Sequence, residues 1–168
     1  MLLIMESWRK FVNEDDKETS YGVLPYRQWQ GDVQFLMGEP PQKTYWTAFK
    51  GGMEEDDRTE HDAAIREFEE ESSFVFDGDM DHTKILTGAT PNKNLKIWLV
   101  EMPHIDPSKF NVDAVMKIVS DDDQWNGKPE IVNVDWLTAA QASAKADAYQ
   151  RPMISQALRM ITGSEKIK

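Results

Sequence analysis

The hydrophobic residues of the chain gather in short stretches separated by polar and turn residues, a pattern that predicts β-strands. The predicted strands are Ser20–Arg27, Asp32–Met37, Thr44–Lys50, Phe74–Phe76, Lys84–Gly88, Leu95–Met102 and Glu130–Trp136. A short turn joins the first two, which therefore predict a hairpin. Pro25 places its end of the first strand at a sheet edge or a bulge, because proline cannot donate a ladder hydrogen bond.

Other stretches space their hydrophobic residues as a helix does, three or four positions apart. They predict helices over Glu6–Asn13, Leu137–Ala148 and Arg151–Ile161, and a shorter helix over Val112–Ile118 inside a long polar insertion, residues 103–129. Strands and helices together predict an α+β fold in a single domain, residues 1–168.

Composition narrows the class of partner. The chain of 168 residues carries 30 acidic and 19 basic residues, a net charge of −11, whereas long nucleic acids are bound by clustered lysine and arginine. We therefore expect no long nucleic acid as a partner, and a small phosphate ester only if a metal supplies positive charge. The absence of cysteine excludes a disulfide framework, a thiolate zinc site and a cysteine nucleophile.

Membrane and export segments are not expected. The apolar start, Met1–Met5, is shorter than the roughly 7 to 15 apolar residues of a secretion signal, and an acidic residue follows it. No stretch approaches the roughly 18 apolar residues of a membrane span. We expect a cytoplasmic protein with no membrane partner, and we keep a homodimer open as its assembly.

The stretch Gly51–Ser73 joins a pair of glycines to an acidic helix. In that helix Glu67, Glu70 and Glu71 are spaced i, i+3 and i+4, which places three carboxylates on one side. Like charges at this spacing destabilise a helix unless a cation holds them together, and oxygen ligands suit a hard divalent metal such as Mg²⁺ or Mn²⁺. The opposing interpretation is a plain solvated acidic face. The residues of the core-facing side are Ala64, Ile65, Phe68 and Ser72.

The same stretch resembles the Nudix box, the signature of the Nudix hydrolases. In that box a glycine is followed six positions later by a glutamate, and eight positions after that by Arg-Glu, an apolar residue, any residue, Glu-Glu, any residue and Gly. With Gly52 as the first glycine, residues 66–71 match the core of the box. Arg58 stands in place of the first glutamate and Ser73 in place of the closing glycine. A residue other than glycine in that left-handed position costs on the order of 1 kcal/mol.

The resemblance extends roughly over residues 19–162, because the order of strands and closing helices also looks like that of the family. It implies a Nudix-type α/β/α sandwich with a central mixed β-sheet. It also implies that Glu67, Glu70 and Glu71, with Gly51, hold Mg²⁺ or Mn²⁺. Glu67 and Glu70 are then catalytic residues as well.

The resemblance implies a catalytic role for Arg66 too, since in the family this arginine orients a metal-binding glutamate by pairing with the first glutamate of the box. Arg58 cannot supply that carboxylate. We expect Asp57 or Glu60, on either side of position 58, to replace it after a small shift of the loop. The alternative for Arg66 is a surface ion pair one helical turn away.

A later glutamate often serves as general base or further metal ligand in this family. Glu130 is the first candidate for this catalytic role, because it precedes the tryptophan of the last predicted strand, and Glu101 is the second. The alternative for both is a surface carboxylate at the end of a strand.

Substrate contacts are expected from Lys50 and Arg27, whose positive charges suit phosphates, and from Trp46, whose ring suits stacking on a base. Tyr45 and Trp98 are further candidates for stacking. The alternative for all three aromatic residues is core packing, since aromatic residues in strands mostly build cores.

The resemblance implies Mg²⁺-dependent hydrolysis of a diphosphate bond in a nucleoside diphosphate linked to another moiety. Candidate substrates are ADP-ribose, dinucleoside polyphosphates and nucleoside triphosphates, so the expected partner is a small nucleotide diphosphate. The competing hypothesis is a non-catalytic Nudix-fold module that binds a nucleotide or a protein, and Arg58 and Ser73 favour it. A third hypothesis, an acidic interaction protein, leaves the spacing from the glycines to the helix unexplained.

Overall fold

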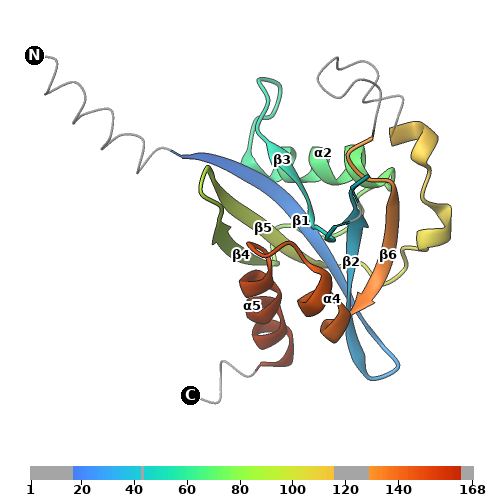
Figure 1. Cartoon of the computed structure of the whole chain (residues 1–168). Coiled ribbons are helices and arrows are strands. Elements are labelled where there is room, and N and C mark those ends of the chain that lie inside the picture. The colour runs from blue at the N-terminus through green and yellow to red at the C-terminus, as the bar shows by residue number, and fades with distance from the viewer. Residues whose placement is uncertain (1–16, 43, 116–128, 164–168) are drawn as a thin grey trace, which may run out of the picture.

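The structure is a computed structural model that describes residues 17–42, 44–115 and 129–163. A mixed β-sheet lies at its centre, with helices on both faces (Figure 1). Helix α2 (Glu60–Ser72) covers one face, and helices α4 (Ala139–Lys145) and α5 (Arg151–Thr162) cover the other. The expected α/β/α sandwich with a central mixed sheet is therefore confirmed.

Within the described residues, six strands form the sheet in the order β4-β5-β1-β2-β6, with β3 beside β1. Their bounds are β1 Glu18–Trp29, β2 Asp32–Glu39, β3 Phe49–Gly52, β4 Lys84–Ala89, β5 Lys93–Glu101 and β6 Asn133–Thr138. Strands β1 and β5 are parallel, and the other pairs are antiparallel. The predicted hairpin is confirmed as β1 and β2. The strands predicted over Lys84–Gly88 and Leu95–Met102 are confirmed as β4 and β5.

Strand β1 changes partner part-way along one of its edges. From Ser20 to Val23 it pairs with β3, and from Tyr26 onwards it pairs with β2, while β5 runs along its other edge. The Tyr26 carbonyl accepts from the Met102 amide on the β5 side, so the preceding residue, Pro25, directs its nitrogen to the opposite edge. There one neighbouring strand has ended and the next has not begun. Pro25 was expected at a sheet edge or a bulge; it lies instead in a central strand, which tolerates proline because this side of Pro25 has no paired neighbour among the described residues.

The change of partner divides the sheet. Strand β2 pairs with β6 from Gln34 to Glu39. Where β2 no longer pairs with β1, strand β3 pairs with β1 in its place. A single bridge, Gly38 to Thr47, joins the two sides. The division opens a cleft near the end of β2, which the candidate site uses.

Each face of the sheet has its own hydrophobic core. Val23 and Leu36 point toward α2, whereas their neighbours Leu24 and Met37 point toward α4 and α5, because successive side chains of a strand alternate between faces. The largest buried side chains under α2 are Leu36, Phe49, Phe68 and Trp98. The core under α4 and α5 includes Phe35, Leu86, Ile97 and Ile154.

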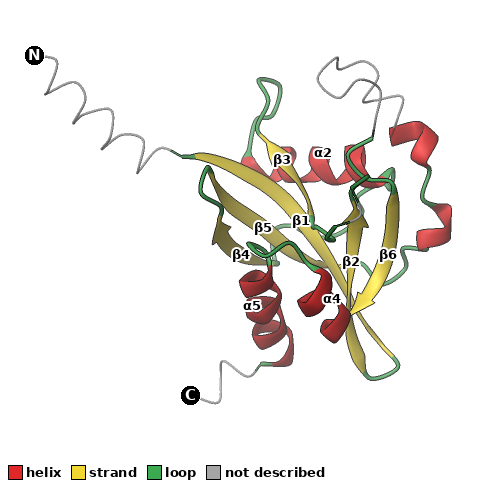
Figure 2. Ribbon diagram, viewed as in Figure 1, coloured by secondary structure: helices red, strands yellow, loops and turns green. Residues whose placement is uncertain are grey.

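The predicted strand Phe74–Phe76 is wrong, since these residues follow α2 as a loop (Figure 2). Phe74 and Phe76 pack against the core under α2, whereas Val75 is 78% exposed. That alternation has the period of a strand, but the Phe76 amide donates to the Glu69 carboxylate at 2.8 Å. The alternation in the sequence reflects burial and not strand pairing.

Other predicted elements differ at their ends. The stretch Thr44–Lys50 becomes strand only where it enters β3, and isolated bridges precede it. The last strand begins later than Glu130, at the start of β6. The helix predicted over Leu137–Ala148 is shortened to α4, because Thr138 caps its first turn in a capping box.

The closing helix is confirmed as α5. Within the helix predicted over Val112–Ile118, residues 112–115 are helical, and the remainder lies outside the described residues, as does the helix predicted over Glu6–Asn13. In the part of the chain that the structure describes, no helix is long and apolar enough to cross a membrane.

Phe68 attaches α2 to the sheet. It has no exposed surface, and its ring makes edge-to-face contacts with Phe49 and Phe76 at centroid distances of 5.4 and 6.0 Å. F68A should therefore lower the free energy of unfolding by about 3–5 kcal/mol, measured by urea denaturation. V75A is the control, because Val75 is exposed, and should change it by less than about 0.5 kcal/mol. Equal losses in the two variants would contradict this packing of α2.

Candidate active site

Helix α2 carries acidic residues at both ends, and those of its last turn lie at the unfavourable end of the helix dipole. The helix begins after Thr59, whose hydroxyl accepts from the Asp62 amide at 3.1 Å, and ends before Ser73. Its last turn contains Glu70 and Glu71 and no basic residue. The carboxyl end of a helix is partially negative, so these carboxylates destabilise it unless positive charge lies nearby.

Glu67 points toward β3, and its side chain is only 13% exposed. It lies directly over Gly51, where an added Cβ would come within 2.3 Å of the Glu67 carboxyl carbon. Glycine is required at this position because the carboxylate occupies the space of a side chain. Burial raises the pKa of Glu67 to about 7, and neighbouring carboxylates add to this effect while Arg66 opposes it.

Arg66 pairs with Asp57, one of the two expected candidates. Its Nε donates to Oδ1 at 3.0 Å and its Nη2 donates to Oδ2 at 2.8 Å, which makes a two-point contact. The Asp57 side chain is 5% exposed and also accepts from the Glu54 amide at 2.8 Å. These hydrogen bonds, the one from Arg66 foremost, lower the pKa of Asp57. Glu60, the other candidate, pairs instead with Lys96 of β5.

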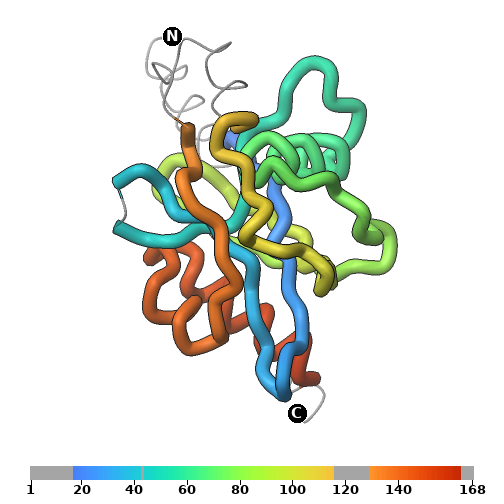
Figure 3. Tube along the Cα trace, turned by 90° about the vertical axis from the view of Figure 1, so that its right-hand side faces the viewer, coloured from blue at the N-terminus to red at the C-terminus, as the bar shows by residue number. Residues whose placement is uncertain are grey.

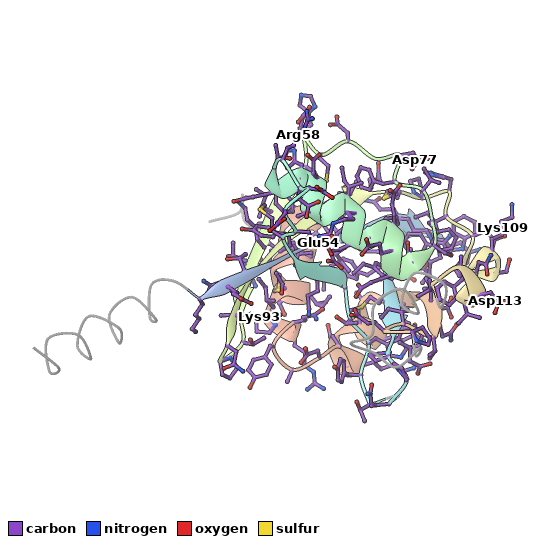
Figure 4. All side chains as sticks on the ribbon, turned by 90° about the horizontal axis from the view of Figure 1, so that it is seen from above. Glu54, Arg58, Asp77, Lys93, Lys109 and Asp113 are labelled. Carbon is purple, nitrogen blue, oxygen red and sulfur yellow. The ribbon has the colours of Figure 1, made fainter. Side chains whose placement is uncertain are left out.

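The remaining nitrogen of Arg66, Nη1, contacts three further carboxylates. Nη1 lies 2.9 Å from Glu67, 3.1 Å from Glu70 and 3.4 Å from Glu54. Figure 4 shows Glu54 beside α2, while Arg58 is exposed at the rim of the molecule. Although burial opposes its charge, the hydrogen bond to Asp57 and then contact with Glu67 and Glu70 raise the pKa of Arg66 above its ordinary value. Arg66 is therefore the cation that holds the acidic cluster together.

Glu71 is turned away from this cluster and is 8% exposed. Its Oε1 accepts from the backbone amide of Lys50 in β3 at 2.8 Å. Burial first, and then a hydrogen bond with Glu130, raises the pKa of Glu71 well above its usual value. Two carboxyl groups that bond to each other need a proton between them. The structure thus brings Glu130, which lies far from α2 in sequence, to the end of the carboxylate triad.

A cleft of about 630 Å³ opens beside Glu71, where the sheet divides. Its walls come from the segment after β2, the approach to β3 and the segment before β6. Among its described lining residues Lys50 is the one basic side chain, against the carboxylates of Glu71, Glu130 and Asp147. Tyr45, 40% exposed, contributes an aromatic ring. The charged lining of the cleft is thus mainly acidic, so the cleft requires added positive charge to accept phosphates.

The oxygen donors of this region suit a hard divalent cation. Within the ranges that the structure describes, however, no three acidic or histidine side chains converge closely enough to form a ready-made metal site. The reason is that Arg66 lies between Glu67 and Glu70, while Glu71 bonds to the amide of Lys50. The residues fit a metal by their chemistry, and binding it requires Glu67 and Glu70 to exchange the guanidinium for the ion.

The structure does not bring Arg27 to this site. Arg27 lies six residues beyond Tyr21, the partner of Gly51, which is roughly 20 Å along an extended strand. Its guanidinium lies between the rings of Trp29 and Trp136, 4.4 Å from each centroid. Stacking between two indoles holds this arginine at the other end of the sheet, so its expected contact with phosphates here is not supported.

Two of the candidate aromatic residues are part of the cores. Trp46 packs against the core under α4 and α5, and Trp98, 2% exposed, lies under α2. These positions favour the core-packing alternative for both, and Tyr45 is the aromatic candidate that lines the cleft. Glu101 is exposed at the end of β5, beside a different cavity. Glu130 is thus the candidate for general base that lies at the cleft.

Two carboxylates at the site, Glu54 and Asp147, are not distinguished by any sequence pattern. Glu54 is one of four successive acidic residues, and only the turn closed by Asp57 brings it to Arg66. Asp147 reaches the cleft because its amide donates to the Trp46 carbonyl at 3.0 Å, a contact between distant parts of the chain.

Comparison with known families decides which family the chain belongs to. A model of the NUDIX domain matches residues 13–157, which is most of the chain. The chain belongs to the Nudix family. A comparison with curated protein sequences finds no match.

Solved structures similar to this Nudix protein include the Ap4A hydrolase of C. elegans in a binary complex, with a TM-score of 0.62, 21% identity and coverage of 87% of this chain and 98% of that chain. The NUDIX domain of Shewanella oneidensis NrtR complexed with ADP ribose has a TM-score of 0.60 and 11% identity, and the match covers 87% of this chain and 88% of that chain. The E. coli dihydroneopterin triphosphate pyrophosphohydrolase has a TM-score of 0.53 and 18% identity, and the match covers 82% of this chain and 92% of that chain. At these identities the likeness shows the shared fold.

Asp57 should be the residue of this Nudix protein on which the position of Arg66 depends. D57N removes the charged partner of a two-point contact, so we expect the free energy of unfolding to fall by about 1.5–3 kcal/mol in urea denaturation. D56N, at the exposed neighbouring position, is the control. R58E, which restores the usual glutamate of the box, should change this free energy little, because Asp57 already accepts from Nε and Nη2 of Arg66. Stabilisation by R58E with no effect of D57N would contradict this assignment.

The buried carboxyl of Glu67 should make stability depend on pH. Its pKa is about 7 in the folded chain against an ordinary value of 4.5, so between these values the folded state binds more protons and stability falls as pH rises. Across that range, in metal-free buffer, E67Q should gain up to about 3 kcal/mol of unfolding free energy relative to wild type. Urea titrations at successive pH values measure the difference. A difference independent of pH would show that Glu67 does not hold its proton.

Proposed function

We propose that the protein hydrolyses a diphosphate bond in a nucleoside diphosphate linked to another moiety, with Mg²⁺ or Mn²⁺ as its cofactor. One observation carries this proposal. The fold gathers Glu67, Glu70 and Glu71 on one helix, beside a cleft that Glu130 enters from another part of the chain. Membership of the Nudix family supports the reaction class.

The chemistry follows from the charge of the substrate. A diphosphate resists hydrolysis because its negative charge repels nucleophiles, and an acidic cleft would repel it further. A divalent ion bound to Glu67, Glu70 and Glu71 would neutralise phosphate oxygens and lower the pKa of a bound water. The side chain of Lys50 adds positive charge at the wall of the cleft. In this proposal Glu130, which is hydrogen-bonded to Glu71, accepts the proton of the attacking water.

The cleft also suggests how a nucleotide would lie. The chain from Tyr45 to Lys50 spans at most roughly 17 Å and follows one wall of the cleft. Lys50 and the carboxylate cluster at one end suit the phosphates, while the ring of Tyr45 at the other suits stacking on a base. Asp147, beside Tyr45, accepts hydrogen bonds from donors of the nucleoside. Similar structures of an Ap4A hydrolase and of a NUDIX domain complexed with ADP ribose support nucleotides of this kind.

A second candidate function is a nucleotide-binding module without catalysis. The observation in its favour is the position of Arg66 between Glu67 and Glu70, which leaves no ready-made metal site among the described residues. The NUDIX domain of NrtR complexed with ADP ribose shows that the fold accommodates a bound nucleotide. The buried carboxylates weigh against this function, since a site that binds no metal gains nothing from their mutual repulsion.

Substitution of Glu70 should distinguish a hydrolase from a nucleotide-binding module without catalysis. Wild-type protein with Mg²⁺ is incubated with ADP-ribose, Ap4A and ATP, and product release is followed by chromatography. E70Q keeps the shape of the side chain and removes its charge, so we expect turnover to fall at least about a hundredfold. E55Q, an exposed loop carboxylate outside the cluster, is the matched control and should stay within about twofold.

The outcomes differ clearly between the hypotheses. No turnover of any substrate by wild type, or equal activity of E70Q, would overturn the catalytic proposal. Binding of ADP-ribose in calorimetry without turnover would instead support the binding module.

A further inference from the structure

Ser73 ends α2 in a backbone conformation that glycine normally adopts. Its φ is 65°, in the left-handed region, where a side chain is strained. The resembling box has glycine here, so this chain keeps a strained residue at a position where a relaxed one is available. A contact made by the side chain is the physical reason to look for.

The hydroxyl of Ser73 makes such a contact. Its Oγ accepts from the backbone amide of Asn111 at 2.9 Å. Asn111 itself begins the helical turn of residues 112–115, because its side chain accepts from the Ala114 amide at 3.1 Å and its carbonyl from the Val115 amide at 3.3 Å. Its own amide precedes the turn and finds its partner in Ser73. The serine therefore joins the end of α2 to a second element.

The segment of residues 105–115 is attached at both ends. It begins beside β6 and then reaches the end of α2, as both views show (Figures 1 and 3). Near its start, the ring nitrogen of Trp136 in β6 donates to the Ile105 carbonyl at 2.9 Å. Along it, Phe110 packs against the core under α2, and Val115 is 1% exposed. Residues 105–115 thus lie between α2 and the strand that follows Glu130.

Glu130 stands at the edge of the same core. Its neighbour Ile131, 1% exposed, packs in the core under α2 together with Ile105 and Trp136. The amide of Val132 donates to the Glu39 carbonyl at 2.8 Å. Any loosening of residues 105–115 therefore reaches the chain next to Glu130 through a shared core.

We propose that Ser73 is a positioning residue, whose hydroxyl holds residues 105–115 on the end of α2 and thereby fixes the wall of the cleft that carries Glu130. For its effect on turnover this inference rests on the proposed function. The departure from glycine in the box then has a purpose in this chain, since the hydroxyl replaces a relaxed helix end by a contact between two sides of the site.

Three substitutions at position 73 separate the hydroxyl from the backbone. S73G removes the hydroxyl and relaxes the backbone, S73A removes the hydroxyl and keeps the strain, and S73N keeps an acceptor in a residue that tolerates this conformation. Amide hydrogen exchange reports the positions directly. We expect the Asn111 amide to exchange at least about tenfold faster in S73G and S73A, and the Val132 amide about threefold faster, with both rates restored toward wild type in S73N. The Ala146 amide, on the opposite face, is the internal control.

Turnover gives the functional readout. We expect kcat to fall about three- to tenfold in S73G and S73A, with KM within about twofold and recovery in S73N. Unchanged exchange at Asn111 would overturn the contact, and faster exchange at Asn111 with Val132 unchanged would overturn the coupling to Glu130. If the exchange results hold but wild type turns over no substrate, the positioning stands and the proposed function fails. If S73A behaves as wild type while S73G does not, backbone flexibility and not the hydroxyl is responsible.

Discussion

The accumulation of carboxylates at the end of one helix is the constraint on which the rest of the site depends. Glu67, Glu70 and Glu71 repel one another, and Glu70 and Glu71 also lie in the last turn of α2, at the negative end of its dipole. Arg66 relieves part of this repulsion from within the same helix, and Asp57 fixes where its guanidinium lies. Even so, burial keeps the pKa of Glu67 near 7, so the cluster is only partly neutralised. Such an arrangement leaves negative charge that a further cation would neutralise.

The sheet supplies the space that this helix needs. Glycine at position 51 lets the Glu67 carboxylate lie against β3, and the backbone of the preceding residue, Lys50, binds Glu71. The exchange of β3 for β2 beside β1 then opens the cleft next to these groups. Pro25 stands at the exchange point, where a hydrogen-bond donor would have no strand to bind. The acidic helix and the divided sheet are therefore two parts of one arrangement, since each places charge or space where the other requires it.

The sequence predicts well those features that depend on local spacing. The carboxylate stripe of α2, the hairpin and the later strands follow from periodicity, and the partner of Arg66 was narrowed to two residues. The choice of Asp57 over Glu60 could not be predicted, because Lys96 draws Glu60 away through a contact between α2 and β5. Arg27 was misplaced for the same reason, since its stacking on Trp136 depends on the position of β6. Where the spacing of residues in the sequence allows more than one partner for a side chain, contacts between distant segments of the chain decide which partner it has.

The shift of the arginine's partner from position 58 to position 57 bears on whether the site is retained or retired. Asp57 has a shorter side chain than glutamate, yet the turn that it closes on the Glu54 amide brings it to Nε and Nη2 of Arg66. Loss of the usual glutamate has therefore been compensated within the same loop. A retired site would release such constraints, because buried like charges lower stability when no ligand rewards them. The compensated pair and the surviving repulsion together favour a site that still binds a cation.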